Sequence, residues 1–322
     1  MRPLWSHQQA ALDACLTTAG HRPGLLALPT GSGKSEIIRR LVLEWLSTRE
    51  TRAVIAVPNL TLAFQLRASF YLHNNTALIP ALCLNGFPIA PAARLHITTY
   101  SSIRYVMEAY RDKRIKRHRI LLIADECHHC NNRASVNYRS ISWFPTRFGF
   151  SASPWSPMCL SLFGCNLIYF LSLSNAIKSG ILCDYSIILD SDLKPNPGKP
   201  FQMFFVRDGS RFSSSVARNG VYFADDISAN RPEGNQSLID RFRQGEIACL
   251  YVNRMLLEGF DCPQVKTIFI EKQTRSHILA YQMLGRGLRR HNQQRLSVFV
   301  DSQAMLDTLA QAMEKANDPY AE

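Results

Sequence analysis

The sequence predicts an α/β fold with two tandem domains, each a mostly parallel β-sheet covered by helices. Apolar, β-type runs alternate with segments of helical periodicity from residue 24 to about 150, and again from about 184 to 316. The runs are nearly continuous in apolar residues, which is typical of parallel strands buried on both faces. A length of 322 residues suits two domains, which we expect to span residues 1–165 and 166–322.

The first half contains five expected strands, and chemically useful residues follow three of them. Lys34 and Asp125 come after the strands at 24–28 and 119–124, and Ser151 ends the strand at 146–151. Parallel sheets of this kind bind ligands at the carboxyl ends of their strands, so these residues are expected to share one edge. The other strands are expected at 52–57 and 95–99, and the helices at 36–45, 60–72 and 101–110.

The second half repeats the alternation after an irregular stretch. Residues 154–183 carry Pro154, Pro157 and Gly164, and we expect them to link the two domains. A second loop is expected at 192–200, which contains three prolines. Strands are then predicted at 184–189, 201–206, 221–224, 247–252, 266–270 and 296–300, and helices at 209–218, 236–243, 276–290 and 302–316.

The composition favours a packed protein with an acidic partner. Thirty-seven Lys and Arg against 25 Asp and Glu give a net charge of +12, which favours nucleic acid, although many basic proteins bind none. A hydrophobic content of 46% excludes a disordered chain. Nine cysteines, an odd number without the spacing of a small disulfide scaffold, favour a reducing compartment. The amino terminus lacks the apolar core of a signal peptide, and the most apolar region, 158–170, is too short for a membrane span. We expect a cytoplasmic or nucleoid-associated protein.

The stretch Leu28-Pro-Thr-Gly-Ser-Gly-Lys-Ser35 joins the first strand to a helical pattern. A strand, a glycine-rich turn ending in Gly-Lys-Ser and a helix form a phosphate cradle, because backbone N–H groups and the positive helix end face one anion. Lys34 would reach the β- and γ-phosphates of ATP, and the Ser35 hydroxyl would bind Mg²⁺. Leu28 stands where the standard pattern has glycine, and many Gly-Ser stretches are simple turns, but the Lys-Ser ending and the flanking elements favour the cradle. The nucleotide-binding residues expected in the loop are Thr30, Gly31, Ser32, Gly33, Lys34 and Ser35.

Two adjacent acids, Asp125 and Glu126, directly follow the expected strand 119–124. Mg²⁺ prefers carboxylate and phosphate oxygens, so we expect Asp125 to hold the ion and Glu126 to polarise an attacking water. An Asp-Glu pair alone is more often a solvated turn, but the buried strand before it and the Lys-Ser cradle favour catalysis. Cys127-His-His-Cys130 also suggests zinc, which we disfavour because four ligands in four consecutive residues wrap a tetrahedral ion poorly.

Five motifs occur in a fixed order. They are Gly33-Lys-Ser35, Asp125-Glu-Cys-His128, Ser151-Ala-Ser-Pro154, Glu258-Gly-Phe-Asp261 and Gln282-Met-Leu-Gly-Arg-Gly-Leu-Arg289. With them the chain resembles superfamily 2 helicases of the DExH/DEAH type from Leu4 to about Val300. It is most similar to RadD-like proteins, restriction-enzyme motor subunits and related repair helicases. The resemblance implies two RecA-like domains with the ATP site in the cleft between them.

The resemblance also assigns the residues that read the nucleotide. Gln8 matches the family's adenine-reading glutamine, with Gln9 as an alternative in register. Without the resemblance, either would be interpreted as an ordinary polar residue on an amino-terminal helix. Gly259 and Asp261 match the motif that senses the nucleotide and contacts the ribose. ATP and Mg²⁺ are the cofactors that this assignment implies.

Residues from the second half would complete the catalytic set. Arg286 and Arg289 match arginine fingers, whose guanidinium groups neutralise charge on the transferring phosphoryl group. Their i, i+3 spacing is expected to place both on one helix face. Without the other motifs they would be interpreted as a basic, solvated helix end. Gln282 and His128 resemble the pair that links the two domains across the cleft.

Nucleic-acid contacts are expected where this fold presents its backbone-binding motifs. Residues 58–61 resemble motif Ia and residues 98–101 motif Ib, whose hydroxyl and N–H groups hold phosphates without reading sequence. Tyr100 is a candidate for base stacking, with core packing as the alternative. The basic run 111–119 either contacts the backbone or is a solvated face, and residues 204–208 match motif IV only weakly. The expected contacts are Pro58, Asn59, Thr61, Thr98, Thr99 and Tyr100.

The hypothesis from the sequence is therefore an ATP hydrolase that acts as a helicase or translocase, with DNA favoured over RNA. Two alternatives stay open: an RNA-directed helicase of the same fold, and an ATP-switched clamp or interaction subunit of a larger complex without unwinding activity. A protein partner that supplies targeting is also expected, because there is almost no sequence beyond the two motor domains. The sequence indicates no membrane partner.

Overall fold

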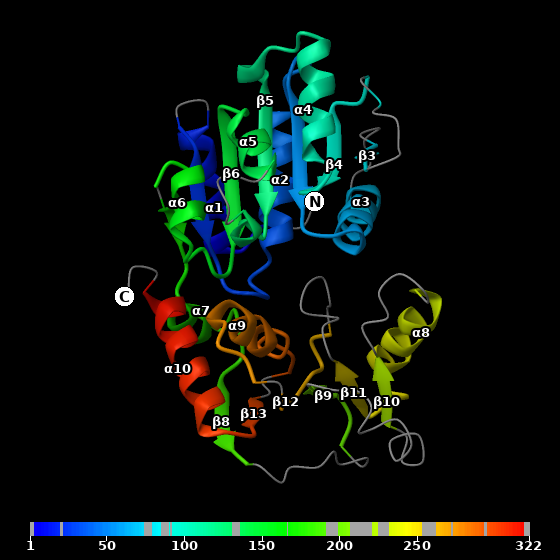
Figure 1. Ribbon diagram of the computed structural model, residues 1–322, viewed down its shortest axis with the longest axis vertical. Coiled ribbons are helices and arrows are strands. Elements are labelled where there is room, and N and C mark those ends of the chain that lie inside the picture. Colours follow the sequence, from blue (N-terminus) through cyan, green and yellow to red (C-terminus); the bar gives the residue numbers. More distant parts are fainter. Residues whose placement is uncertain are drawn as a thin grey trace. The chain divides into compact units, whose positions relative to one another are not determined.

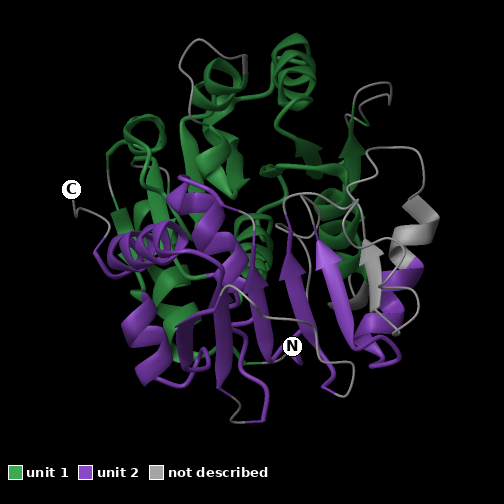
Figure 2. Cartoon of the chain, turned by 60° about the horizontal axis from the view of Figure 1, so that its bottom comes forward, with its two compact units in different colours: residues 1–29, 33–172, 322 green, residues 30–32, 173–321 purple. Residues whose placement is uncertain are grey.

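The computed structural model describes residues 3–19, 22–73, 79–84, 90, 92–130, 136–165, 167–190, 199–206, 221–224, 232–252, 262–271, 273–292 and 295–318. The chain divides into two compact units, coloured separately in Figure 2. The first comprises residues 1–29, 33–172 and 322, and the second comprises residues 30–32 and 173–321. The main change of unit therefore falls between Ser172 and Leu173.

The first unit is built on a seven-stranded sheet in the order β3-β4-β2-β5-β6-β1-β7, and all its strand pairs are parallel (Figure 1). Its central strands are buried along almost their whole length, which fits their aliphatic sequences and the helices on both faces. The strands are β1 Gly24–Ala27, β2 Arg52–Val57, β3 Ala81–Cys83, β4 Leu95–Thr99, β5 Ile120–Asp125, β6 Thr146–Ser151 and β7 Leu167–Phe170.

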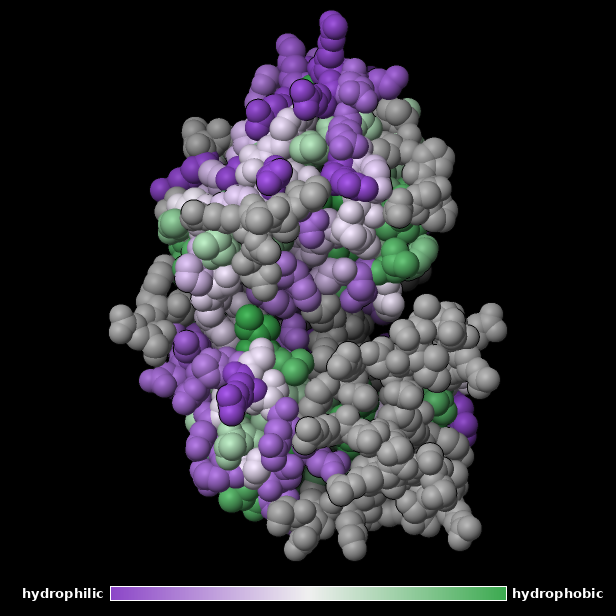
Figure 3. Space-filling view, viewed as in Figure 1, coloured by the Kyte–Doolittle hydropathy of each residue, from purple (hydrophilic) through white to green (hydrophobic). Residues whose placement is uncertain are grey.

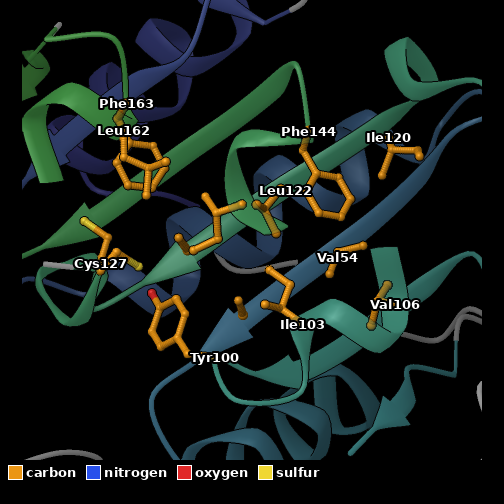
Figure 4. Packing of buried hydrophobic residues seen from close by; sticks show 14 of the residues in the cluster. Val54, Tyr100, Ile103, Val106, Ile120, Leu122, Cys127, Phe144, Leu162 and Phe163 are labelled. Atoms are coloured by element: carbon orange, nitrogen blue, oxygen red, sulfur yellow. The ribbon is translucent and has the colours of Figure 1, made fainter. Parts of the chain in front are cut away.

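Helices connect these strands, as parallel pairing requires. The core of one face is formed by side chains of β2, β5 and α4 with the segments around Cys127, Phe144 and Phe163 (Figure 4). The helices of this unit are α1 Ser6–Thr18, α2 Lys34–Trp45, α3 Leu60–His73, α4 Ile103–Asp112, α5 Val136–Ser142 and α6 Pro157–Leu162, with short 3₁₀ turns η1 Arg117–Arg119 and η2 Cys127–His129.

The segment 154–183 is more regular than expected, because it contains three regular elements, and the main change of unit falls within it. Pro157 occupies the first turn of α6, a position that tolerates proline since the N–H it lacks would have no partner within the helix. Strand β7 pairs with β1 of the first sheet, and α7 (Leu173–Lys178) opens the second unit. The sequence was misread because short elements beside Pro and Gly resemble loops.

The second unit contains a six-stranded sheet in the order β10-β11-β9-β12-β13-β8, again with only parallel pairs among the described strands. The strands are β8 Tyr185–Leu189, β9 Gln202–Phe205, β10 Val221–Ala224, β11 Cys249–Val252, β12 Thr267–Ile270 and β13 Leu296–Val300. Its helices are α7, α8 Pro232–Arg243, α9 His277–Gly285 and α10 Gln303–Asn317. The helix expected at 209–218 lies outside the described residues.

An aromatic ladder crosses the second sheet. Phe204 stacks on Phe269 with ring centroids 3.8 Å apart, Tyr251 continues the ladder on one side and Phe299 on the other. Stacked cross-strand rings stabilise the pairing of the neighbouring strands. The described part of the chain contains no helix long and apolar enough to cross a membrane. All nine cysteines are free thiols.

Candidate nucleotide-binding site

Loops that carry the predicted site residues leave the same edge of the first sheet. Strand β6 lies between β1 and β5, with Ala27 opposite Ser151 and Asp125 opposite Phe150 in parallel register. The backbone N–H of Leu28 donates to Ser151 O at 3.1 Å, so the start of the loop is fixed to the end of β6. The segments that follow β1, β5 and β6 therefore meet at their carboxyl ends.

The turn before α2 requires glycine at position 33. Gly33 has φ 84°, in the left-handed region that glycine adopts without steric cost. A Cβ built at this position would lie 2.3 Å from Gln8 Nε2, so the Gln8 side chain packs directly against the turn. Gln8 is buried, whereas Gln9 is exposed and donates to Asp13. Gln8 is therefore the glutamine that lies beside the turn, and its Oε1 also accepts a hydrogen bond from the Trp5 N–H at 3.0 Å.

Lys34 is the first residue of α2 and its side chain is almost fully buried. Its ammonium lies 3.3 Å from Leu28 O and 3.7 Å from Glu126 Oε1. Lys34 and Glu126 are thus brought together although 91 residues separate them in the chain. The positive end of α2 begins at the same point, which makes the site attractive to an anion. Ser35 follows Lys34 in this first turn.

Glu126 has a strained backbone conformation. Its φ of 49° places it in the left-handed region, which non-glycine residues adopt at a cost of about 1–3 kcal/mol unless the surroundings hold them. The conformation turns the chain sharply from β5 into η2. It directs one carboxylate oxygen of Glu126 toward Lys34 and brings the other within 3.5 Å of His128 Nδ1.

His128 connects the acid to the end of β6. Its Nδ1 lies 3.0 Å from Ser151 Oγ, and Ser151 Oγ also accepts a hydrogen bond from the Ser153 N–H at 3.0 Å. One buried imidazole therefore lies between the two motifs, hydrogen-bonded to Ser151 and 3.5 Å from the Glu126 carboxylate. This chain, from Lys34 through Glu126 and His128 to Ser151, holds the carboxylate in a defined orientation.

Asp125 ends β5 beside this chain. Its Oδ1 accepts from the Glu126 N–H at 3.1 Å, and its backbone carbonyl accepts from the Tyr100 hydroxyl at 2.6 Å. The donor set of the Ser35 hydroxyl and the Asp125 carboxylate consists of hard oxygen ligands, which fits Mg²⁺ bound together with phosphate oxygens. Cys127 and Cys130 are buried in the core, and the described residues include no group of three or more His, Cys, Asp or Glu placed to hold a metal ion.

Comparison with known proteins agrees with this geometry. The model of the family described as "Type III restriction enzyme, res subunit" (ResIII) matches residues 2–156. This match covers slightly less than half of the chain. No curated protein matches the sequence.

Several solved structures have a similar fold over almost the whole chain. The DUF1998 helicase MrfA, bound to DNA and AMPPNP, is 14% identical with a TM-score of 0.74, over 98% of this chain and 51% of that one. The Type ISP restriction-modification enzyme LlaBIII bound to DNA gives a TM-score of 0.73 at 14% identity, over 98% of this chain and 30% of that one. Dbp5 of S. cerevisiae, bound to RNA and ADP BeF3, gives 0.67 at 15% identity, over 98% and 88%. The chain thus spans under a third of LlaBIII and about half of MrfA.

The helicase motifs that were expected to bind nucleic acid follow β2 and β4. Asn59 caps α3, because its Oδ1 accepts from the Leu62 N–H at 2.9 Å. Pro58 is half-buried and Thr61 is exposed on the first turn of α3. Thr99 is buried, and its hydroxyl lies 2.9 Å from Ser101 Oγ.

Two side-chain roles expected in this region are wrong. The Thr98 hydroxyl is fully buried and donates to Cys83 O at 2.6 Å, so it is not presented to a phosphate. The Tyr100 ring packs in the core, is 5% exposed and has its hydroxyl on Asp125, so it does not stack on a base (Figure 4). A tyrosine at the end of a strand has the same sequence pattern whether it packs inward or outward, and tertiary packing decided the outcome.

The second-unit residues of the helicase motifs lie in and after α9. Gln282 and Arg286 are buried, and Arg286 Nε donates to Gln282 O at 3.4 Å. Burial, with a smaller effect of the Arg243 charge, lowers the pKa of Arg289 to about 10, so it stays protonated at neutral pH. Gly259 and Asp261 lie outside the described residues.

The expected shared helix face for the two arginines is wrong. Helix α9 ends at Gly285, Arg286 is its carboxyl cap, and Arg289 forms an isolated antiparallel bridge with Leu182. A Cβ at Gly287 would lie 2.4 Å from Leu296 Cδ1 and 2.9 Å from Ile268 Cδ1, so this glycine is needed for close packing on β12 and β13. The backbone leaves the helix in order to pack there.

Proposed function

We propose that the chain is an ATP hydrolase stimulated by nucleic acid, which acts as a helicase or translocase on DNA. The observation that carries the proposal is the placement of the Lys34 ammonium 3.7 Å from the Glu126 carboxylate, with His128 and Ser151 behind the acid. Hydrolysis of a nucleoside triphosphate uses a cation that binds the phosphates and a carboxylate that orients the attacking water. Lys34, at the amino terminus of α2, and Glu126 are suited to these two tasks.

In this proposal each group of the phosphate loop and of the first unit has one task. Lys34 and the backbone at the start of α2 bind the β- and γ-phosphates, while Gln8 contacts the base. Glu126 orients the attacking water, and His128 keeps its carboxylate in position through the contact at 3.5 Å. Ser35 and Asp125 would hold Mg²⁺, which neutralises phosphate charge when bound. The other loop residues, Thr30, Gly31 and Ser32, would contribute backbone contacts to the phosphates.

The second unit would supply the remaining groups. Arg286 and Arg289 are assigned to stabilise charge on the transferring phosphoryl group, and Gly259 and Asp261 to contact the ribose. Gln282 would couple nucleotide binding to the closing of the two domains on ATP. Because a guanidinium group is planar and always charged, it is suited to a phosphate that gains charge as the reaction proceeds.

Nucleic acid would be held along the carboxyl edge of the first sheet. Pro58, Asn59, Thr61 and Thr99 lie at the ends of β2 and β4, where backbone N–H groups and hydroxyls hold phosphates without reading sequence. MrfA and LlaBIII were solved bound to DNA and Dbp5 bound to RNA. DNA is favoured because the motifs of the second half resemble restriction-enzyme motors more than DEAD-box RNA helicases.

ATP hydrolysis measured with matched DNA and RNA strands tests the choice of substrate. The proposal expects Mg²⁺-dependent hydrolysis that rises several-fold or more with single-stranded or forked DNA, and less with RNA of the same sequence. Equal or greater stimulation by RNA would replace the DNA assignment with an RNA-directed helicase. Hydrolysis that is unchanged by any nucleic acid, at several salt concentrations, would contradict the proposal itself.

Strand displacement distinguishes a helicase from a translocase or a clamp. Displacement of a labelled strand from a forked duplex would show unwinding, and removal of a protein block from a single strand would show translocation. A clamp would give ATP-dependent retention on DNA without either. Co-purification from the native cell tests the targeting partner, and a free monomer that is fully active and selective would contradict a need for one.

A further inference from the structure

A basic face lies on the edge of the first sheet opposite the nucleotide site. It consists of Arg111, Lys113, Arg114, Lys116, Arg117 and Arg119, between the end of α4 and the start of β5. The sheet is parallel, so the residues before β5 lie at its amino edge, whereas Asp125 and Glu126 lie at its carboxyl edge. A strand of six residues at about 3.3 Å each separates the two edges by roughly 20 Å. Figure 3 shows strongly hydrophilic surface gathered here, at the top of the view, over the end of α4 labelled in Figure 1.

The charges of the basic face are mostly not used within the fold. Arg111, Lys113, Arg114, Lys116 and Arg117 are exposed. Among the described residues, Arg119 is the member of the face that forms an ion pair, with Glu50.

Other arginines of the same edge have structural roles and set a contrast. Arg52 donates to Ala93 O at 2.7 Å, and Arg94 donates to Leu46 O at 2.6 Å and Thr51 O at 3.2 Å. Both are half-buried and fix the loops between strands. Arg52 and Arg94 therefore contribute hydrogen bonds to the fold. Apart from Arg117, the exposed cations of the basic face have no comparable structural role among the described contacts.

One cation of the face is held in a fixed position. The Arg117 guanidinium lies over the Trp143 ring, 4.9 Å from its centroid, and donates to Trp143 O. A guanidinium fixed in this way loses less conformational entropy when it binds a phosphate. Trp143 is half-buried under Arg117, which covers its ring, and the exposed imidazole of His118 lies in the same segment.

We propose that the basic face binds the phosphate backbone of a DNA duplex, separately from the strand held at the carboxyl edge. Clustered exposed cations suit the closely spaced phosphates of a duplex, which carries one negative charge per about 1.7 Å of helix axis, better than a single strand, whose binding relies largely on stacked bases. The site would anchor duplex beside the segment on which the motor acts. It goes beyond the proposed ATPase, because binding at this face needs no nucleotide.

The test compares two lysine pairs in the full-length chain without nucleotide. The test variant is Lys113→Gln/Lys116→Gln, which leaves Arg114 intact because its φ of 53° makes that position sensitive to substitution. The matched control is Lys178→Gln/Lys266→Gln, which removes two exposed lysines from the second unit. Both variants lower the net charge by two. Binding to a blunt duplex of about 30 base pairs is measured by fluorescence anisotropy at several salt concentrations.

The test variant is expected to bind the duplex about tenfold or more weakly at roughly 0.1 M salt, with the slope of log K against log salt reduced by about 2. The control should bind like the unchanged protein. Hydrolysis of ATP at saturating single-stranded DNA should be the same in all three proteins, and this readout separates the basic face from the proposed motor site.

Several results would overturn the proposal. Equal duplex binding by the test and control variants would show that the face is only solvated. Polyglutamate serves as a probe for acidic protein segments. If the test variant bound the duplex normally but no longer retained polyglutamate, the face would be assigned to an acidic protein segment instead. Loss of ATP hydrolysis at saturating single-stranded DNA in the test variant, with its melting temperature unchanged, would show that the face is part of the motor track.

Discussion

The two units of the chain have the same kind of sheet and different chemistry at their motif positions. In the first unit a lysine, two carboxylates and an imidazole are brought together at the ends of β1 and β5. In the second unit the described motif residues are Gln282, Arg286 and Arg289, whereas Glu258 and Asp261 lie outside the described residues. The comparison teaches that two sheets of the same kind can present different side chains: those of the first unit lie at or after the ends of strands β1, β5 and β6, whereas those of the second unit lie in and after helix α9.

Their interiors differ as well. The core of the first unit around β5 is mainly aliphatic and includes a buried polar pair, His96 with Tyr110. The second sheet is crossed by the ladder of Tyr251, Phe204, Phe269 and Phe299. Substitutions that affect one unit alone can therefore test whether each unit has the role assigned to it.

The largest effect is expected from the arginines of the second unit. Arg286→Ala and Arg289→Ala should each lower kcat for ATP hydrolysis by about 10³-fold, while nucleotide affinity changes much less, because the guanidinium groups act on charge that develops during the reaction. The measurement is steady-state ATP hydrolysis at saturating nucleic acid, together with binding of a fluorescent nucleotide.

Arg290→Ala is the matched control for these variants. Arg290 is exposed and its guanidinium donates to Gly180 O at 2.8 Å, so its loss should leave kcat within about twofold. If Arg289→Ala and Arg290→Ala had the same small effect on kcat, the second unit would not take part in the chemistry. The division of catalytic groups between the two units would then be contradicted.

The first unit should respond in two distinct ways. Glu126→Gln is expected to lower kcat by about 10²–10³-fold with nucleotide binding retained, because it removes the group that orients water. Lys34→Ala should weaken nucleotide binding as well as hydrolysis, because it removes a phosphate ligand. Glu108→Gln, an exposed acid on α4, serves as the control. Normal kcat in Glu126→Gln would contradict the role of the carboxylate.

The buried polar pair gives a smaller effect, confined to stability. Tyr110 and His96 are almost fully buried, and the Tyr110 hydroxyl lies 2.6 Å from His96 Nδ1. Tyr110→Phe should destabilise the first unit by about 1–2 kcal/mol, because it leaves a buried imidazole nitrogen without its hydrogen bond. Tyr71→Phe, at an exposed position, should change stability by less than about 0.5 kcal/mol. Hydrogen exchange should show lower protection in the first sheet than in the second. An equal loss of protection in both sheets would contradict an effect confined to the first unit.

The same pair predicts a pH dependence. Burial lowers the pKa of His96, with a further lowering by Arg52 that is opposed by the hydrogen bond of Nε2 to Ala90 O. The folded state therefore prefers the neutral imidazole, and the unfolded state binds the proton first. The contribution of His96 is complete above its unfolded pKa of about 6.5 and is lost as pH falls below that value, by at most about 1.4 kcal/mol per pH unit. Denaturant unfolding from pH 7.5 to 5.5 should show this step, and His96→Gln should lack it.

Much of the fold follows from the sequence because its signals are local. Apolar runs predicted β2, β4, β5, β6 and β13 to within a residue or two, since buried parallel strands depend on little else. Strand β7 and helix α6 were missed because they are short and lie beside Pro157 and Gly164. Strand β3 was missed because it has only three residues.

The site shows where sequence reasoning ends. Motif order predicted that Lys34, Asp125 and Glu126 would meet, because the loops after parallel strands share an edge. It gave no sign that Glu126 adopts a left-handed backbone or that His128 bonds to Ser151, since both depend on packing around η2. Tyr100 and the path of the chain after Gly285 were misjudged for the same reason: a side chain or helix end is placed by its neighbours.

The most direct test of the central claim is ATP hydrolysis by the unchanged protein and by Glu126→Gln, each measured with and without single-stranded DNA. We predict Mg²⁺-dependent hydrolysis that DNA stimulates in the unchanged protein, and a rate about 10²–10³-fold lower in Glu126→Gln with DNA present. Hydrolysis that does not respond to DNA, or that is the same in both proteins, would contradict the account.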